Sequence, residues 1–137
     1  MGLDWSSEGV DWRDESLDDA MARDWLEATH GPSRVPMDVW DRVLELTQTD
    51  LDPPRGWRLA KRLVELATTD RELWLVGRDV LATIAREHWG LIAAELEELY
   101  RTDQKWRQAF EGQMSPALIE IQQRAEGGDS ATKTEPI

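Results

Sequence analysis

The stretch Leu63–Asp70, LVELATTD, decides the fold, because two close variants of it occur elsewhere in the chain. They are Val43–Asp50, VLELTQTD, and Leu96–Asp103, LEELYRTD. An aliphatic pair suits the last turn of one helix. The Thr-Asp pair suits the start of the next, because these side chains accept hydrogen bonds from unpaired N–H groups at helix N-termini. The repeat therefore predicts one helical module that is used three times.

Tryptophan spacing supports this modular interpretation. From Trp25 to Trp106, six tryptophans occur at intervals of 15 to 17 residues. With one tryptophan per helix and two helices per unit, the period is 32 to 34 residues, in the range of HEAT and TPR helical hairpins. Burying roughly 200 Å² of one indole contributes about 5 kcal/mol before opposing terms. We therefore expect an interior position for Trp40, Trp57, Trp74, Trp89 and Trp106.

Glycine, proline and capping residues mark the helix boundaries. No segment alternates with a period of two, so the sequence predicts an all-α fold, a six- to seven-helix bundle or a short HEAT/TPR-like helical-hairpin solenoid, over residues 16–126. Gly77 lies inside one helical pattern, where a close helix crossing would explain it. The expected helices begin at Ser16, near Pro36, after Pro54, after Asp70, after Gly90, at Asp103 and at Ser115.

The two ends of the chain differ from this body. Residues 1–15 hold a shorter acidic and aromatic repeat, LDWSSE and VDWRDE, around Trp5 and Trp12. We expect a flexible segment here that orders on contact with a partner; the alternative is that both indoles fold back onto the body. Residues 127–137 are polar and are expected to form a disordered tail.

Composition excludes several classes of function. The 137 residues carry a net charge of −12 and no cysteine, which excludes disulfides and thiolate chemistry. Phosphate binding needs a cationic footprint, so we expect no nucleic-acid partner. No apolar run approaches the roughly 20 residues of a membrane span, and no signal peptide is recognisable. We expect a single-domain cytoplasmic protein with no membrane partner.

Part of the chain resembles a family of small, uncharacterised bacterial all-helical proteins. Asp103–Phe110, DQKWRQAF, is similar to the family's Asp-Pro-x-Phe-Arg-x-Ala-Leu motif. Val76, Gly77, Leu81, His88 and Gly90 are similar to its glycine, its leucine and its His-Gly corner. Ala82 stands where the family has an acid, and Trp89 interrupts the corner. The resemblance covers residues 20–112 and implies an all-helical fold and nothing more.

Catalytic and metal-binding patterns are missing from the sequence. The two histidines, His30 and His88, lie 58 residues apart, and no His-x-x-x-His occurs. No Gly-x-Ser-x-Gly and no phosphate-binding glycine loop is present. The repeated Glu45, Glu65 and Glu98 occupy equivalent helix positions and belong to the architecture. We expect no catalytic residue, no metal site and no cofactor.

Two groups of residues are candidates for partner binding. Arg55, Arg58 and Arg62 share one helix face, because they are three and four residues apart. A solvated or internally paired face is the ordinary interpretation, and the alternative is a dock for an acidic partner or for the N-terminal segment. Trp5 and Trp12, seven residues apart, would lie on one side of a helix and are predicted to engage a basic partner.

Size and charge together favour a non-enzymatic protein-binding domain. Small acidic domains of this kind serve as immunity proteins or antitoxins that neutralise a basic protein, and complementary charge speeds such association. One alternative is a small-molecule or peptide binder with a tryptophan-lined groove. Another is an acidic nucleic-acid mimic. The sequence leaves the oligomeric state open.

Overall fold

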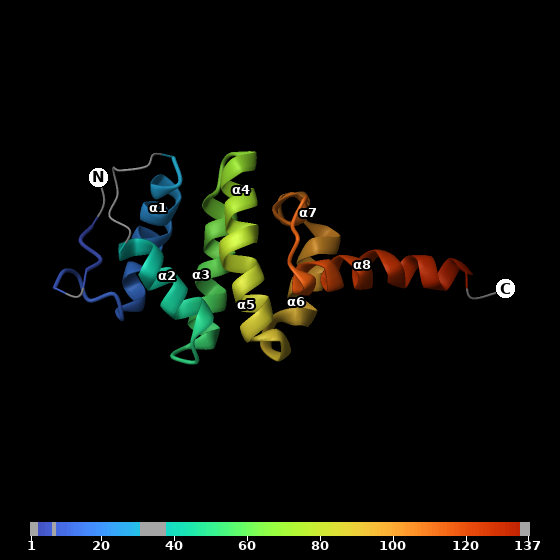
Figure 1. The fold of residues 1–137 in the computed structure, drawn as a ribbon, viewed down its shortest axis with the longest axis horizontal. Coiled ribbons are helices and arrows are strands. Elements are labelled where there is room, and N and C mark those ends of the chain that lie inside the picture. Colours follow the sequence, from blue (N-terminus) through green and yellow to red (C-terminus); the bar gives the residue numbers. More distant parts are fainter. Residues whose placement is uncertain (1–2, 7, 31–37, 135–137) are drawn as a thin grey trace.

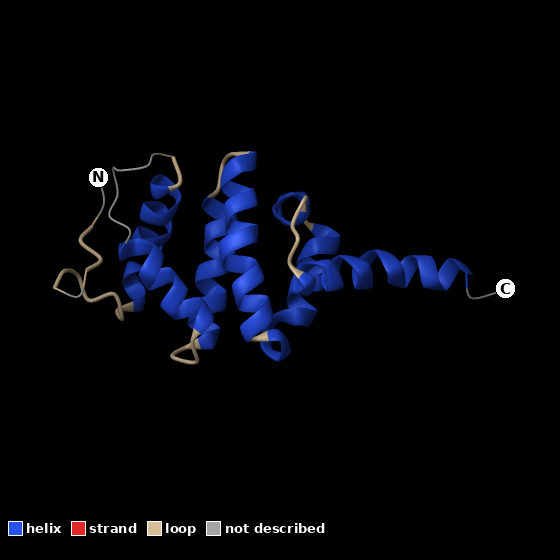
Figure 2. Ribbon diagram, in the orientation of Figure 1, coloured by secondary structure: helices blue, strands red, loops and turns tan. Residues whose placement is uncertain are grey.

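The computed structural model describes residues 3–6, 8–30 and 38–134, with the backbone alone for residues 128–134. Helices and connecting loops make up this part of the chain, and no strand occurs in it (Figure 2). The predicted all-α fold is therefore confirmed. The elements are the 3₁₀ turn η1 (Glu15–Leu17), α1 (Asp18–Ala28), α2 (Asp38–Gln48), α3 (Pro53–Leu66), α4 (Asp70–Val76), the π turn η2 (Gly77–Leu81), α5 (Ala82–Glu87), α6 (Trp89–Thr102), α7 (Gln104–Phe110) and α8 (Pro116–Thr134).

One long central helix organises the bundle. The elements α4, η2 and α5 follow one another without a break from Asp70 to Glu87. Helices α2 and α3 pack on one side of it, and α6, α7 and α8 pack on the other (Figure 1). Helix α1 covers α2 and α3 at one end of the molecule, while α8 extends away from the body at the other.

Two of the three Thr-Asp pairs start helices as the repeat predicts. The Thr69 side chain accepts a hydrogen bond from the backbone N–H of Glu72, and the Glu72 carboxylate accepts one from the backbone N–H of Thr69. This capping box begins α4. Asp103 accepts from the N–H of Lys105 at 2.9 Å and begins α7. Local capping chemistry therefore fixes both boundaries.

The first Thr-Asp pair does not cap a helix. The cap of α3 is Asp52, which accepts from the N–H of Arg55 at 3.2 Å. Pro53 and the proline after it occupy the first helical positions, where a missing N–H costs nothing. The prolines thus set the start of α3 three residues beyond Asp50.

Tryptophan burial is uneven along the body. Trp57 and Trp106 are buried and meet edge to face, with ring centroids 5.8 Å apart. Trp40 and Trp89 are half-buried against the core, which agrees only in part with the prediction of an interior position. The prediction is wrong for Trp74, which is 36% exposed. Trp74 lies on the solvent side of the central helix, because the core-facing stripe of that helix is Leu73, Val76, Val80 and Ile84.

Residues 3–6 and 8–17, called here the N-terminal strap, are docked on the bundle. Trp5 is completely buried, and Trp12 is 7% exposed. The Asp24 carboxylate accepts hydrogen bonds from the Trp5 indole N–H at 2.6 Å and from the Leu3 backbone N–H at 2.8 Å. Arg42 donates to the Trp5 carbonyl and lies over the Trp12 ring. The expected flexible segment is therefore corrected: both indoles fold back, because the body supplies their polar partners.

The prediction of a disordered tail over residues 127–137 also changes. Helix α8 continues from Pro116 to Thr134, through the start of the expected tail at Gly127. Its first half packs on α5 and α6, and helix extension from an anchored segment adds a hydrogen bond for each residue ordered. Residues 135–137 lie outside the described part of the chain.

Gly77 marks the close helix crossing that the sequence predicted. A Cβ atom there would lie 2.0 Å from the carbonyl oxygen of Ala109 in α7. The same glycine opens the π turn, in which the Ala82 N–H donates to the Gly77 carbonyl five residues earlier. The central helix and α7 approach each other so closely only because this position has no side chain.

Candidate binding groove

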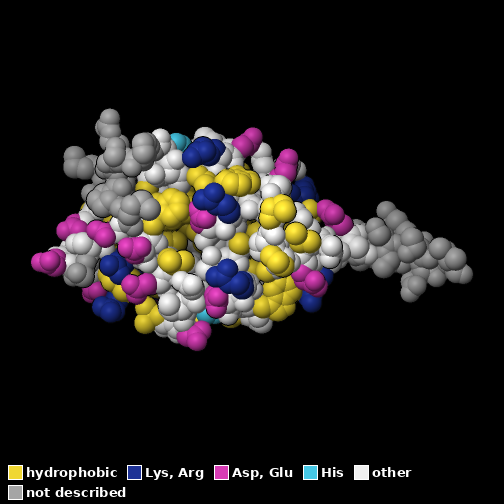
Figure 3. Space-filling model, in the orientation of Figure 1, with side chains coloured by type: hydrophobic (Ala, Val, Ile, Leu, Met, Phe, Trp, Pro, Cys, Tyr) yellow, Lys and Arg dark blue, Asp and Glu magenta, His cyan; other side chains and the backbone are white. Residues whose placement is uncertain are grey.

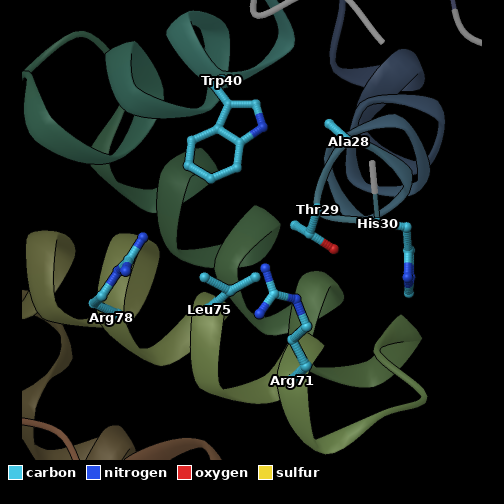
Figure 4. Close-up of a pocket in the computed structure, with 7 residues that line it drawn as sticks. All are labelled: Ala28, Thr29, His30, Trp40, Arg71, Leu75 and Arg78. Atoms are coloured by element: carbon cyan, nitrogen blue, oxygen red, sulfur yellow. The ribbon is translucent and has the colours of Figure 1, made fainter. Parts of the chain in front are cut away.

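Two adjoining hollows form a groove between the end of α1, helix α2 and the central helix. The cationic hollow, about 460 Å³, is lined by Ala28, Thr29, His30, Trp40, Arg71, Leu75 and Arg78 (Figure 4). The apolar hollow, about 310 Å³, is lined by Trp25, Trp40, Asp41, Val43, Leu44, Arg78, Asp79, Val80 and Thr83. Trp40 and Arg78 belong to both hollows, so the groove is continuous. Each volume lies in the usual range of about 300–1,000 Å³ for ligand sites.

Arg71 supplies an uncompensated charge to the cationic hollow. Its guanidinium points from α4 into the space between Leu75 and Thr29 (Figure 4). Among residues 3–6, 8–30 and 38–134, it has no hydrogen-bond or ion-pair partner. The Thr29 hydroxyl beside it already donates to the Leu26 carbonyl at 2.6 Å. Arg71 therefore retains five N–H donors for an anionic ligand.

Arg78 differs from Arg71 because the central helix compensates its charge. Its guanidinium bonds both oxygens of Asp79, at 2.9 and 3.1 Å, and lies 4.9 Å from the centroid of the Trp74 ring. The hydrogen bonds with Asp79 raise the pKa of Arg78, although burial opposes that shift. Figure 3 shows Lys and Arg side chains interleaved with hydrophobic surface over the middle of the molecule.

A histidine–carboxylate contact fixes the rim of the cationic hollow. His30 Nε2 is hydrogen-bonded to Glu72 Oε2, which ties the end of α1 to the start of α4. Glu72 also accepts from the Thr68 backbone N–H at 2.6 Å. Burial by itself would raise the pKa of Glu72, but the bonds from Thr68 and His30 together lower it. The carboxylate is thus held in its charged form by donors on two elements.

Trp40 forms the wall that the two hollows share. Its ring stacks on Trp25 with centroids 5.0 Å apart and planes at 26°. Its indole N–H is buried and finds no acceptor within the described ranges. Leaving a donor buried without an acceptor costs about 1–3 kcal/mol.

The structure places Arg55 in the interior and away from the groove. The side chain is 4% exposed and pairs with Asp18 at 2.8 Å. It also donates to the carbonyl oxygens of Trp12 at 2.7 Å and Arg13 at 2.8 Å. Burial raises the pKa of Asp18, and Arg55 opposes that shift. Arg55 thus docks the N-terminal strap, one of the alternatives that the sequence left open.

The other arginines of the predicted stripe are paired within the chain. Arg58 bonds Glu15 at 2.7 Å, and Arg62 bonds Asp19 at 2.8 Å. The five predicted partner-binding residues therefore do not form one exposed surface, because Arg55, Trp5 and Trp12 are buried. The internally paired face, the ordinary interpretation of this stripe, is the one found for Arg58 and Arg62.

Sequence reasoning missed the groove residues Arg71, Arg78 and Trp40 as a group. A signal existed in the seven-residue interval between Arg71 and Arg78, which spans about two helical turns and keeps both on one face. Nothing in the sequence placed Trp40, on a different helix, opposite them. The groove therefore depends on tertiary packing between α2 and the central helix.

The described residues add two observations about other kinds of site. No group of three or more His, Asp or Glu side chains among them is arranged to hold a metal ion. None of their helices has the length and apolar character needed to cross a bilayer.

Comparisons with family models, with curated proteins and with solved structures found no match for this chain. The resemblance to an uncharacterised bacterial helical family stays a prediction.

Proposed function

We propose that this chain is a non-enzymatic protein-binding domain that captures an acidic segment of its partner in the cationic hollow. The single observation that carries the proposal is the guanidinium of Arg71, which is directed into a hollow with apolar walls and has no hydrogen-bond or ion-pair partner within the described ranges. It stays without an acid there although the chain carries 28 acidic and 16 basic residues.

The surroundings of Arg71 suit a carboxylate. Arginine presents paired N–H donors that match two carboxylate oxygens. Leu75 and Trp40 border the same hollow, and apolar walls reduce the screening of charge by water. Arg78, which is bonded to Asp79, and His30, which is bonded to Glu72, lie at the edges of the hollow. An acidic side chain would therefore be bound more strongly here than on an open surface.

An open, continuous groove favours a polypeptide ligand. The cationic and apolar hollows meet at Trp40 and Arg78 and together form a groove. A segment of a partner protein can lie along such a surface, with several side chains in contact. The proposal therefore combines a protein-binding domain with one alternative from the sequence, a peptide binder with a tryptophan-lined groove. The role of an immunity protein or antitoxin for a basic protein stays a prediction that rests on size and net charge.

A peptide-display selection tests the proposal. The full chain is immobilised and screened against a library of random dodecapeptides, in parallel with Arg71→Glu. We expect enrichment of peptides that contain Asp or Glu on the wild-type chain and loss of those peptides on Arg71→Glu. The matched control is Arg86→Glu, since Arg86 is exposed on the same helix, pairs with Glu87 and does not line the groove. Equal enrichment on wild type and Arg71→Glu would overturn the proposal.

A further inference from the structure

We infer that the bound segment is amphipathic, with an acidic residue in the cationic hollow and an apolar side chain in the apolar hollow. The inference rests on the proposed function and specifies the chemistry of the partner. It is carried by a second feature of the groove, the hydrophobic surface between α2 and η2, which is independent of Arg71.

The apolar hollow has a buried floor and an exposed edge. Val43 and Val80 are only 2% and 1% exposed and form the floor, whereas Leu44 at the edge is 43% exposed. A single exposed leucine on a surface is ordinary. Leu44 instead borders a hollow of about 310 Å³ beside the Trp40 ring, and a ligand side chain seated there would remove both from water.

The two hollows fix a spacing between the two recognised side chains. Arg71 and Val80 stand nine residues apart on the continuous central helix, roughly 13 Å at 1.5 Å per residue. An extended peptide advances about 3.3 Å per residue. A separation of about four residues between acid and apolar side chain therefore matches an extended segment, and about nine residues match a helical one.

Charge determines which end of the segment carries the acid. Asp41 and Asp79 line the apolar hollow, and Asp79 already compensates Arg78. A second acid placed there would face like charge. At the Arg71 end the rim carboxylate, Glu72, is already bonded to His30 and Thr68, and Arg71 keeps its donors. The acidic residue of the partner is thus directed to the α1 end of the groove, and the apolar residue to the end beside η2.

The test uses two fluorescein-labelled dodecapeptides in a Gly-Ser background, read by fluorescence anisotropy with the full chain. The first contains two adjacent glutamates followed, four residues later, by two leucines; in the second, serines replace the leucines. We expect the first to bind at least tenfold more tightly. In Leu44→Ser the affinity for the first peptide falls about tenfold, while the affinity for the second is unchanged. Leu91→Ser in α6, 49% exposed and outside the groove, serves as the control.

The outcomes separate the inference from the proposed function. If both peptides bind equally and both lose binding in Arg71→Glu, the amphipathic inference is overturned and the acidic-segment proposal stands. If neither peptide binds, both are overturned. Circular dichroism of each variant verifies the fold, and the exposure of Leu44 and Arg71 makes these substitutions compatible with it.

Discussion

Arg55 and Arg71 are the same residue type on neighbouring helices, and the chain treats them in opposite ways. The Arg55 guanidinium is enclosed by the Asp18 carboxylate and by carbonyl groups of the N-terminal strap. The Arg71 guanidinium lies in the cationic hollow and meets no acceptor within the described ranges. One arginine joins two parts of the fold, and the other remains available to a ligand.

The difference shows why net charge is a poor guide to the binding face of this protein. Residues 1–30 hold nine of the 28 acidic residues. Several of these, including Glu15, Asp18 and Asp19, pair with arginines on α3. Much of the acidic excess near the N-terminus is therefore used within the molecule. What a partner meets therefore depends on which charges the fold leaves unpaired, and the net charge alone does not identify them.

Removing Arg55 is expected to have the largest effect on stability. Arg55→Met removes a buried guanidinium and leaves the half-buried Asp18 carboxylate and two strap carbonyls without their donor. Loss of one side of a buried pair costs about 3–5 kcal/mol. Urea unfolding followed by circular dichroism measures this change. Arg58→Met, on the same helix, is the control: its pair with Glu15 is half-exposed on both sides, and about 0.5 kcal/mol or less is expected. Equal effects of the two substitutions would contradict the structural role of Arg55.

Gly77→Ala is expected to be the next most damaging change. The new Cβ would meet a backbone carbonyl of α7 at 2.0 Å, so α7 must move, and overpacking of this kind costs about 1–3 kcal/mol. That loss outweighs the roughly 1 kcal/mol by which alanine favours a helix over glycine. Thermal or urea unfolding gives the value. Gly90→Ala is the matched control, because no described atom lies within 4 Å of its Cβ, and this variant should be at least as stable as wild type.

Acid should weaken the rim of the groove through Glu72. Its folded-state pKa lies below the ordinary value of 4.5, so its stabilising contribution is present above that value and is lost as the pH falls through the lowered pKa. We expect the stability difference between wild type and Glu72→Gln to shrink from pH 6 to pH 3 in urea titrations. A pH-independent gap for Glu72→Gln would contradict the assignment.

Arg71→Ala is expected to have the smallest effect on stability. No hydrogen bond or ion pair within the described ranges is lost, and Arg71 is exposed, so the free energy of unfolding should stay within about 0.5 kcal/mol of wild type. Binding of the acidic peptides should nevertheless disappear. Measured beside Arg55→Met, this variant sharpens the contrast between a structural and a ligand-directed arginine. A loss of several kcal/mol would show that Arg71 supports the fold.

Helix boundaries were predictable because they depend on local chemistry. The capping residues Thr69 and Asp103 and the proline pair at α3 all act within four residues of the boundary they set. The exposure of Trp74 was also predictable, since Arg71, Trp74 and Arg78 are three and four residues apart and share one helix face. The aromatic character of Trp74 favours an interior position, but the exposed face that it shares with two arginines outweighs it.

The docking of the N-terminal strap and the groove could not be predicted from local sequence patterns. Trp5 is buried because Asp24 and Arg42, 19 and 37 residues away, supply its hydrogen-bond partners. The groove combines the end of α1, helix α2 and the central helix. Such arrangements depend on contacts between segments that are distant in sequence. A repeat of helix signals determines how many helices form but not which side chains face the space between them.

The wide turn η2 absorbs one extra residue in the central helix. It contains Arg78, Asp79 and Val80 of the groove, and Ile84 in the next turn is completely buried. A π turn takes about one residue more than an α turn to cover nearly the same rotation. Deleting one residue here would therefore restore a regular helix and leave α5 facing the interior as before. The groove would lose one of its lining positions, so at this point the chain can change its recognition surface in a single step and keep its fold.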